Sequence, residues 1–142
     1  MKELGEIYRA IEAALEGTGV KHVDLWNHNV EFIEQETAWE TPAVFVEFRP
    51  IGWEGVKEVL YRGTVEVTLH IVTAWEGTES RDVTWATADE VAGAVEGLSG
   101  DIFSGLRLTE TQVNHNHEEL VETLESYRCR VSRRIERQSK GV

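Results

Sequence analysis

The polar segment Asn114-His115-Asn116-His117-Glu118-Glu119 holds the residue types in this chain that are best suited to chemistry. Imidazole and carboxylate groups are common ligands of Zn²⁺ and other transition metals. On a strand, His115 and His117 would point the same way, and Glu119 or His70 could complete a three-ligand metal set. The same residues could instead form a hairpin turn, in which polar side chains satisfy backbone groups and face water, or could contact a neighbouring subunit.

Motifs that mark enzymes are missing from the sequence. It contains no G-x-S-x-G elbow, P-loop, H-E-x-x-H helix or glycine-rich dinucleotide loop, and its carboxylates show no pattern that selects an acid and base pair. The single cysteine, Cys129, alternates with Tyr127 and Val131, which favours a small buried hydrophobe over a nucleophile. We therefore expect no catalytic residues, no cofactor and no enzymatic activity.

The charge of the chain is unevenly distributed. The net charge is −12, yet residues 128–142 hold six basic side chains and one acidic side chain, whereas the other 127 residues hold eight basic and 25 acidic ones. A surface this acidic does not wrap nucleic acid, because phosphate contacts require a basic patch. The basic C-terminal end could be a solvated charged end, or it could dock on an acidic surface, including that of another copy.

Three of the five tryptophans, Trp39, Trp53 and Trp75, fall in predicted loops or at strand ends. A large exposed ring at such a position would be unusual unless something covers it. Packing under their own loops would explain these residues, and so would a subunit interface.

The element that must position these groups is the segment 57–75. From position 61 to 71 its odd positions are mostly apolar and its even positions polar, which predicts a half-buried strand with its even face toward water or a partner. A run of about 15 residues spans roughly 50 Å, well beyond a usual strand. One end should therefore leave the body of the domain as an arm.

The remaining periodic segments predict an α+β fold. We expect an antiparallel or mixed sheet of about five strands, with two helices packed on one face and a long hairpin-like arm, in a single domain over 1–142. The predicted helices are 2–16, with Leu4, Ile7, Tyr8, Ile11 and Leu15 on one face and Glu3 outside it, and 82–98, with Trp85, Val91, Val95 and Leu98 in one stripe. The other predicted strands are 23–25, 43–48, with Val44, Val46 and Phe48 toward the core, 106–113 and 124–135, with a loop at 50–55 and a hairpin around 114–119.

Nothing in the sequence suggests a membrane segment. The longest apolar runs are only a few residues, far short of the roughly 20 needed to span a bilayer. The N-terminus MKELGEIYRAIEAAL carries charges where a signal peptide needs apolar residues. We expect a protein of the cytosol with no membrane partner.

The succession of these segments resembles the tail-terminator or tail-completion proteins of long-tailed phages and prophages, which belong to the head-tail neck. The resemblance covers nearly the full length. It rests on VDLWN, TPAVFVEF, a tryptophan in the following segment, LHIVTAW, GLSGD, LRLTET, NHNHEEL and YRCRVSRR.

This resemblance implies a structural virion assembly protein that forms a ring, typically of six copies, at the head-proximal end of the tail. Its implied partners are itself, the tail tube protein and the head connector protein, and DNA would pass through the ring without specific binding. The implied location is the host cytoplasm during assembly and then the virion tail or neck. The residues to which we assign subunit contacts are Trp53, Tyr61, Arg62, Trp75, Arg128, Arg130 and Arg134.

Two further hypotheses concern electrostatics. The acidic even-numbered strand face, or the acidic segment 31–40, would line the channel and repel phosphates, and the arginine-rich end would contact an acidic neighbour. Two other functions stay open from the residues alone: a small homo-oligomeric binding module of a bacterial cell, or a metal-binding enzyme that uses His115 and His117.

Overall fold

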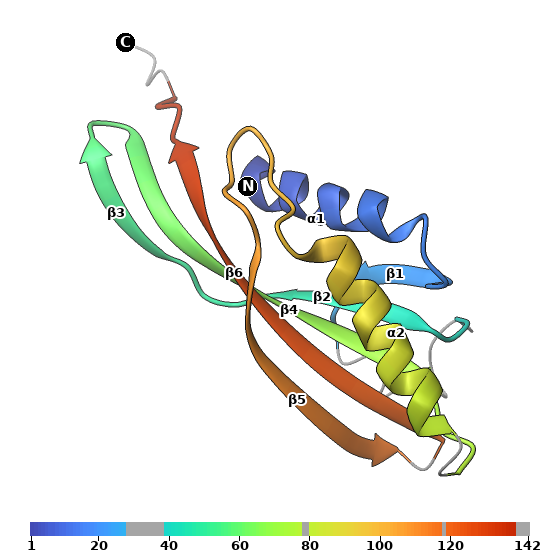
Figure 1. Cartoon of the computed structure of the whole chain (residues 1–142). Helices are drawn as coiled ribbons and strands as arrows, with labels where there is room; N and C mark the ends of the chain where they lie inside the picture. The colour runs from blue at the N-terminus through green and yellow to red at the C-terminus, as the bar shows by residue number, and fades with distance from the viewer. Residues whose placement is uncertain (28–38, 78–79, 118, 139–142) are drawn as a thin grey trace.

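The computed structural model describes residues 1–27, 39–77, 80–117 and 119–138, and side chains 115–117 are not described. Along the chain the elements are α1 (Lys2–Leu15), β1 (His22–Leu25), β2 (Ala43–Phe48), β3 (Gly52–Lys57), β4 (Leu60–Ala74), α2 (Ser80–Val95), β5 (Arg107–His117) and β6 (Leu120–Arg134). The predicted α+β fold is confirmed, with one mixed sheet and two helices on one of its faces (Figure 1).

The sheet is built around β4. This strand pairs with β6 along its entire length, from Leu60 opposite Arg134 to Ala74 opposite Leu120. On the other side of β4, β2 pairs with one half and β3 with the other half. The strand β1 extends the sheet beyond β2 in the parallel direction, and β5 forms the edge beyond β6. The predicted hairpin around 114–119 is therefore present as the β5–β6 pair.

The arm is the half of β4 that pairs with β3, together with the end of β6. Figure 1 shows these strands extending past the helices at the upper left. The segment 50–55 was expected to be a loop, and this was wrong, because β3 pairs with β4 and turns back at Glu58, whose φ is 34°. Its glycines hide the strand pattern in the sequence. With β3 included, the sheet has six strands instead of about five.

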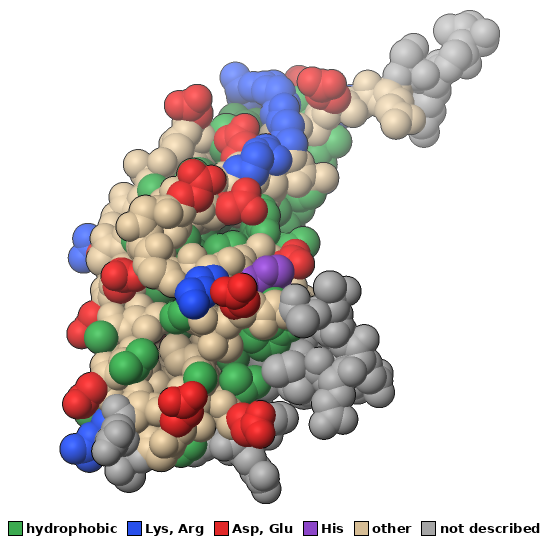
Figure 2. All heavy atoms as spheres, turned by 90° about the vertical axis from the view of Figure 1, so that its right-hand side faces the viewer, with side chains coloured by type: hydrophobic (Ala, Val, Ile, Leu, Met, Phe, Trp, Pro, Cys, Tyr) green, Lys and Arg blue, Asp and Glu red, His purple; other side chains and the backbone are tan. Residues whose placement is uncertain are grey.

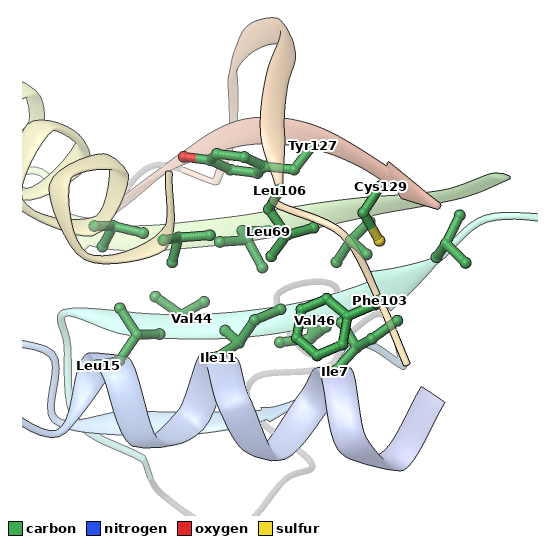
Figure 3. Packing of buried hydrophobic residues seen from close by; sticks show 14 of the residues in the cluster. Ile7, Ile11, Leu15, Val44, Val46, Leu69, Phe103, Leu106, Tyr127 and Cys129 are labelled. Atoms are coloured by element: carbon green, nitrogen blue, oxygen red, sulfur yellow. The ribbon is translucent and has the colours of Figure 1, made fainter. Parts of the chain in front are cut away.

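The main core lies between the sheet and the two helices (Figure 3). Ile7, Ile11 and Leu15 of α1 recur every four residues, so they share one face and pack against β2 and β4. The odd-numbered apolar residues of β4 and β6 point into the same layer, as predicted. Burying each such side chain contributes about 1.5–3 kcal/mol. The buried set includes Val44, Val46, Val65, Val67, Leu69, Ile71, Tyr127, Cys129 and Val131.

Two predictions about the helices were wrong. Trp85 does not face the core, because its ring is 58% exposed and the buried stripe of α2 runs through Thr84, Ala88, Val91 and Val95. The Thr84 hydroxyl is satisfied there by a 2.9 Å hydrogen bond to the Thr73 hydroxyl. In α1, Glu3 is buried, not outside, and its carboxylate lies 3.9 Å from Arg133 on β6.

The opposite face of the sheet is also partly covered, which the alternation in 61–71 did not indicate. A second cluster of Ala43, Phe45, Val72 and Leu120 lies there, with Trp26 and Trp39 packed against it. The even-numbered Thr68 and His70 are consequently buried rather than exposed. In β2, side chains on both faces are buried, so Val44 and Val46 do not form its only core face.

The strand β5 is longer and more exposed than its alternation predicts. Leu106, just before it, is buried, but Leu108 and Val113 are 46% and 57% exposed. The edge position explains this exposure, because a strand with one neighbour has less to pack against.

Replacing Gly93 with Ala should stabilise the fold. Gly93 lies inside α2, and a Cβ added there would meet nothing within 4 Å. Because glycine inside a helix costs conformational entropy, we expect the free energy of unfolding to rise by about 0.5–1 kcal/mol, measured by urea denaturation.

Gly63 supplies the matched control, because the same substitution there should destabilise the fold. A Cβ at Gly63 would lie 2.8 Å from Cε3 of Trp53 and 2.9 Å from Cγ2 of Ile51. We expect a loss of about 1–3 kcal/mol from this overpacking. Equal effects of the two substitutions would contradict the placement of Trp53 over Gly63.

Candidate functional site

The predicted metal ligands are not brought together with His70. His117 lies opposite Leu120 and His70 lies opposite Leu124, so they are about 13 Å apart along the sheet. The side chains of His115 and His117 lie outside the described residues. Glu119 is exposed, and its carbonyl accepts a 2.8 Å hydrogen bond from the backbone of Trp75. Within the described part of the chain, no three His, Cys, Asp or Glu side chains are placed to hold a metal ion.

His70 is instead the centre of a buried polar network. Its Nδ1 lies 2.6 Å from a carboxylate oxygen of Glu122 on β6, and its Nε2 lies 2.7 Å from one of Glu47 on β2. Arg49 extends the network with a 3.1 Å contact to the second oxygen of Glu47. Carboxylate oxygens accept hydrogen bonds, and which ring nitrogen donates depends on the tautomer of His70.

The ring of Trp26 covers this network. It lies parallel to the His70 ring, with 3.8 Å between the centroids and 5° between the planes. The backbone N–H of Trp26 donates to the carbonyl of Val46, which fixes the residue just after β1. Both nitrogens of His70 are occupied and its side chain is only 5% exposed, so the network holds β2, β4 and β6 in register rather than presenting a reactive group.

Sequence reasoning considered His70 only as a metal ligand and missed its partners. Glu47 and Glu122 are 23 and 52 residues away, and nothing local in the sequence pairs them with a histidine. The available signal was a histidine flanked by apolar residues in a strand, where a polar side chain needs a partner if it is buried.

The seven residues predicted for subunit contacts are divided among three places. Arg62, Arg128, Arg130 and Arg134 share one face of the arm, because Arg62 pairs with Ser132 and the three others alternate along β6. We call these four residues the arginine face. They lie on the sheet face opposite the helices.

Trp53 and Tyr61 lie on the other face of the arm. The Trp53 ring packs against Gly63 and lies under the guanidinium of Arg133, which is 5.6 Å from the ring centroid. This is the local packing that the sequence left open for this tryptophan. Trp75 follows the far end of β4, about 45 Å along the strand from Tyr61, and so does not join the arm.

The arginine face has two acidic neighbours on adjacent strands, since Glu54 of β3 lies opposite Arg62 and Glu66 of β4 lies opposite Arg128. Arg49, Arg81, Arg107 and Arg133 each have a carboxylate at 3.1–3.9 Å. Among the described residues, the four arginines of the arginine face form no ion pair and no side-chain hydrogen bond.

The even-numbered face is mixed in charge. Its outer half carries the arginine face together with Glu54, Glu66 lies opposite Arg128, and further carboxylates lie toward the body. That this face lines a channel stays a prediction. The alternative segment, 31–40, falls mostly outside the described residues. Figure 2 shows the side of the molecule at the right of Figure 1, where acidic side chains are scattered and basic ones gather toward the upper end.

Two neighbouring hollows lie on this sheet face. One, of about 650 Å³, is lined by polar and basic groups that include Thr64, Ser104, Thr109, Arg107, Arg128 and Arg130. The next, of about 280 Å³, has a mainly acidic and polar lining of Glu47, Arg49, Glu66, Thr68, Glu110, Gln112, Leu124 and Ser126. Glu66 borders both hollows, so a basic region and an acidic region adjoin on one surface.

Cys129 is the small buried hydrophobe that the sequence predicts. It is 3% exposed, and burial raises the pKa of its thiol to about 11. Burial also raises the pKa of the Tyr127 hydroxyl, and the carboxylates of Glu125 and Glu96 raise it further. Neither group is poised as a nucleophile or a base near neutral pH.

Replacing His70 with Ala should be strongly destabilising. The substitution leaves Glu47 and Glu122 facing each other without the imidazole, and Glu122 is 3% exposed. We expect the free energy of unfolding to fall by about 3–5 kcal/mol in urea denaturation. The matched control is His22→Ala, because the His22 ring lies 4.0 Å from the exposed carboxylate of Asp24. We expect it to lower the free energy of unfolding by about 1 kcal/mol. Similar losses for both would show that the network contributes nothing specific.

Cys129 should resist thiol reagents in the folded protein. Because its pKa is raised from 9.0 to about 11, the thiolate is about a hundredfold scarcer near pH 8 than in the unfolded chain. Native labelling should be slower by at least that factor, and addition of denaturant should remove the difference. By linkage, the stability contribution of the neutral thiol is complete below pH 9 and is lost as the pH rises toward 11. Labelling at equal rates in both states would contradict the burial.

In the part of the chain that the structure describes, no helix has the length and apolar character needed to cross a membrane. No family model matches the chain, and no curated protein matches it by sequence. The fold is similar to that of a chain in the "Virion of native gene transfer agent (GTA) particle", with a TM-score of 0.61 and 15% sequence identity. The alignment covers 92% of this chain and 97% of that one, so the two share their fold over almost their whole length.

Proposed function

We propose that this chain is a structural protein of a phage-like virion, and that it acts as the tail terminator. The observation that carries the proposal is the shared fold with a chain of a gene transfer agent virion particle, which extends over nearly all of both chains. Because the match covers 92% of this chain and 97% of the other, it concerns nearly the complete domain and not one common motif.

The internal contacts of the chain support a structural role. The buried histidine bonds to two carboxylates, the buried cysteine has a raised pKa, and the hydroxyls of Thr68 and Ser126 bond to each other at 2.9 Å. These polar groups hold strands together. The arm, in contrast, presents unpaired side chains beyond the body, as expected of a subunit that contacts copies of itself.

The specific role follows from the sequence resemblance to tail-terminator proteins. In this role the chain forms a ring, typically of six copies, at the head-proximal end of the tail. The ring caps the tail tube protein and joins it to the head connector protein, and DNA passes through it without specific binding. The protein assembles in the host cytoplasm and ends in the virion neck.

Deleting the gene from a particle-producing strain tests this role. We expect DNA-filled heads and separate tails whose ends are uncapped, seen by electron microscopy of the lysate, with tailed particles restored by a plasmid copy. The Gly93→Ala chain should restore them equally well, because its substitution lies on an exposed part of α2. Normal tailed particles from the deletion strain would refute the role.

A further inference from the structure

The arginine face is a concentrated positive charge on a protein with a net charge of −12. Along β6, Arg128, Arg130 and Arg134 span about 20 Å, and Arg62 of β4 lies beside them. The sequence has 26 acidic side chains, yet none of those that the structure describes forms an ion pair with these four arginines.

The neighbours of the arginine face across the sheet are mixed in charge. Arg128 lies between Glu66 of β4 and Arg107 of β5. Opposite charges across a sheet stabilise the pair and like charges destabilise it. Arg130 and Arg134, nearer the arm tip, lie opposite uncharged residues of β4 and form no ion pair among the described residues. Their guanidinium groups are therefore available to a partner outside the chain.

The chemistry of the surface specifies that partner as an anion with planar oxygen pairs. Guanidinium groups bind carboxylates through two parallel hydrogen bonds, and the hydroxyls of Thr64 and Ser104 line the same hollow as further donors. The arm projects past the helices, so these groups can reach a neighbouring molecule (Figure 1).

A second copy supplies the complementary surface. Glu66 and Glu110 line the adjacent acidic hollow, and within the described residues their carboxylates also have no ion pair or hydrogen bond. On this sheet face Arg130 and Arg134 lie nearer the arm tip than Glu66 and Glu110, so the arm of one copy can lie over the body of the next. Duplex DNA fits less well, because the net charge of −12 repels phosphates at long range.

We propose that the arginine face of one copy docks on Glu66 and Glu110 of the next copy. This inference rests on the proposed function, since it identifies the contact through which copies assemble. The contact is heterologous, so successive copies close into a ring where the rotation between them allows it.

Charge reversal in both surfaces tests the contact. Arg130→Glu with Arg134→Glu makes arm and body both acidic, and Glu66→Arg with Glu110→Arg makes both basic. We expect each double variant to lose self-association by at least about tenfold relative to the original chain, measured by sedimentation velocity at low salt. An equimolar mixture of the two should regain it, because each arm then meets a body of opposite charge.

The charge-matched control is Arg9→Glu with Arg81→Glu. It changes the net charge by the same amount on the helices, away from the sheet face, and should associate like the original chain. Circular dichroism of all variants separates lost contact from lost fold.

Three outcomes would overturn the contact: an original chain that stays monomeric at low salt and high concentration, arginine variants that associate normally, or a mixture that does not recover. Binding of a duplex DNA probe that disappears in the arginine variants, with association unchanged, would assign the surface to phosphates instead. None of these outcomes bears on the deletion experiment, which tests the proposed function through particle morphology alone.

Discussion

The pairing of β4 with β6 is the constraint on which the rest of the structure depends. Fifteen residues of each strand pair without a shift in register, so every side chain of one strand has a fixed neighbour on the other. A shift by one residue would exchange the core face for the outer face. The main core, the His70 network and the grouping of the four arginines all follow from this single register.

The two faces of this strand pair serve different purposes. Toward the helices, odd-numbered side chains such as Val65, Leu69 and Tyr127 are aliphatic or aromatic and close the core against α1 and α2. On the other face, the middle of the pair is sealed by Trp26 and Trp39 over a polar network, while the outer part is open and charged. The polar network fixes the strands where apolar packing alone would permit neighbouring registers.

Sequence alone predicted the elements whose burial is strictly periodic. Val65, Val67, Leu69 and Ile71 gave the central strand, and Ile7, Ile11 and Leu15 gave the first helix. The alternation in 124–135 also predicted that Arg128, Arg130 and Arg134 share a side. The prediction failed where a buried residue is polar: Thr84 replaced Trp85 in the core stripe, and His70 proved to be inside. Such residues are buried because of partners far away in the sequence, and periodicity carries no information about those partners. That the four arginines form no ion pair among the described residues is likewise visible only in three dimensions.

The arm consists of three strands, since β6 continues beside β4 out to Arg134 while β3 lies on the other side. An isolated two-stranded ribbon is marginal in water, but a third strand, with Trp53 laid over Gly63, gives the projection a shape of its own. A projection that is rigid before it meets its target loses little conformational entropy on contact. Incoming subunits would thus encounter a preformed template, and growth of an assembly would be limited by diffusion and orientation rather than by coupled folding.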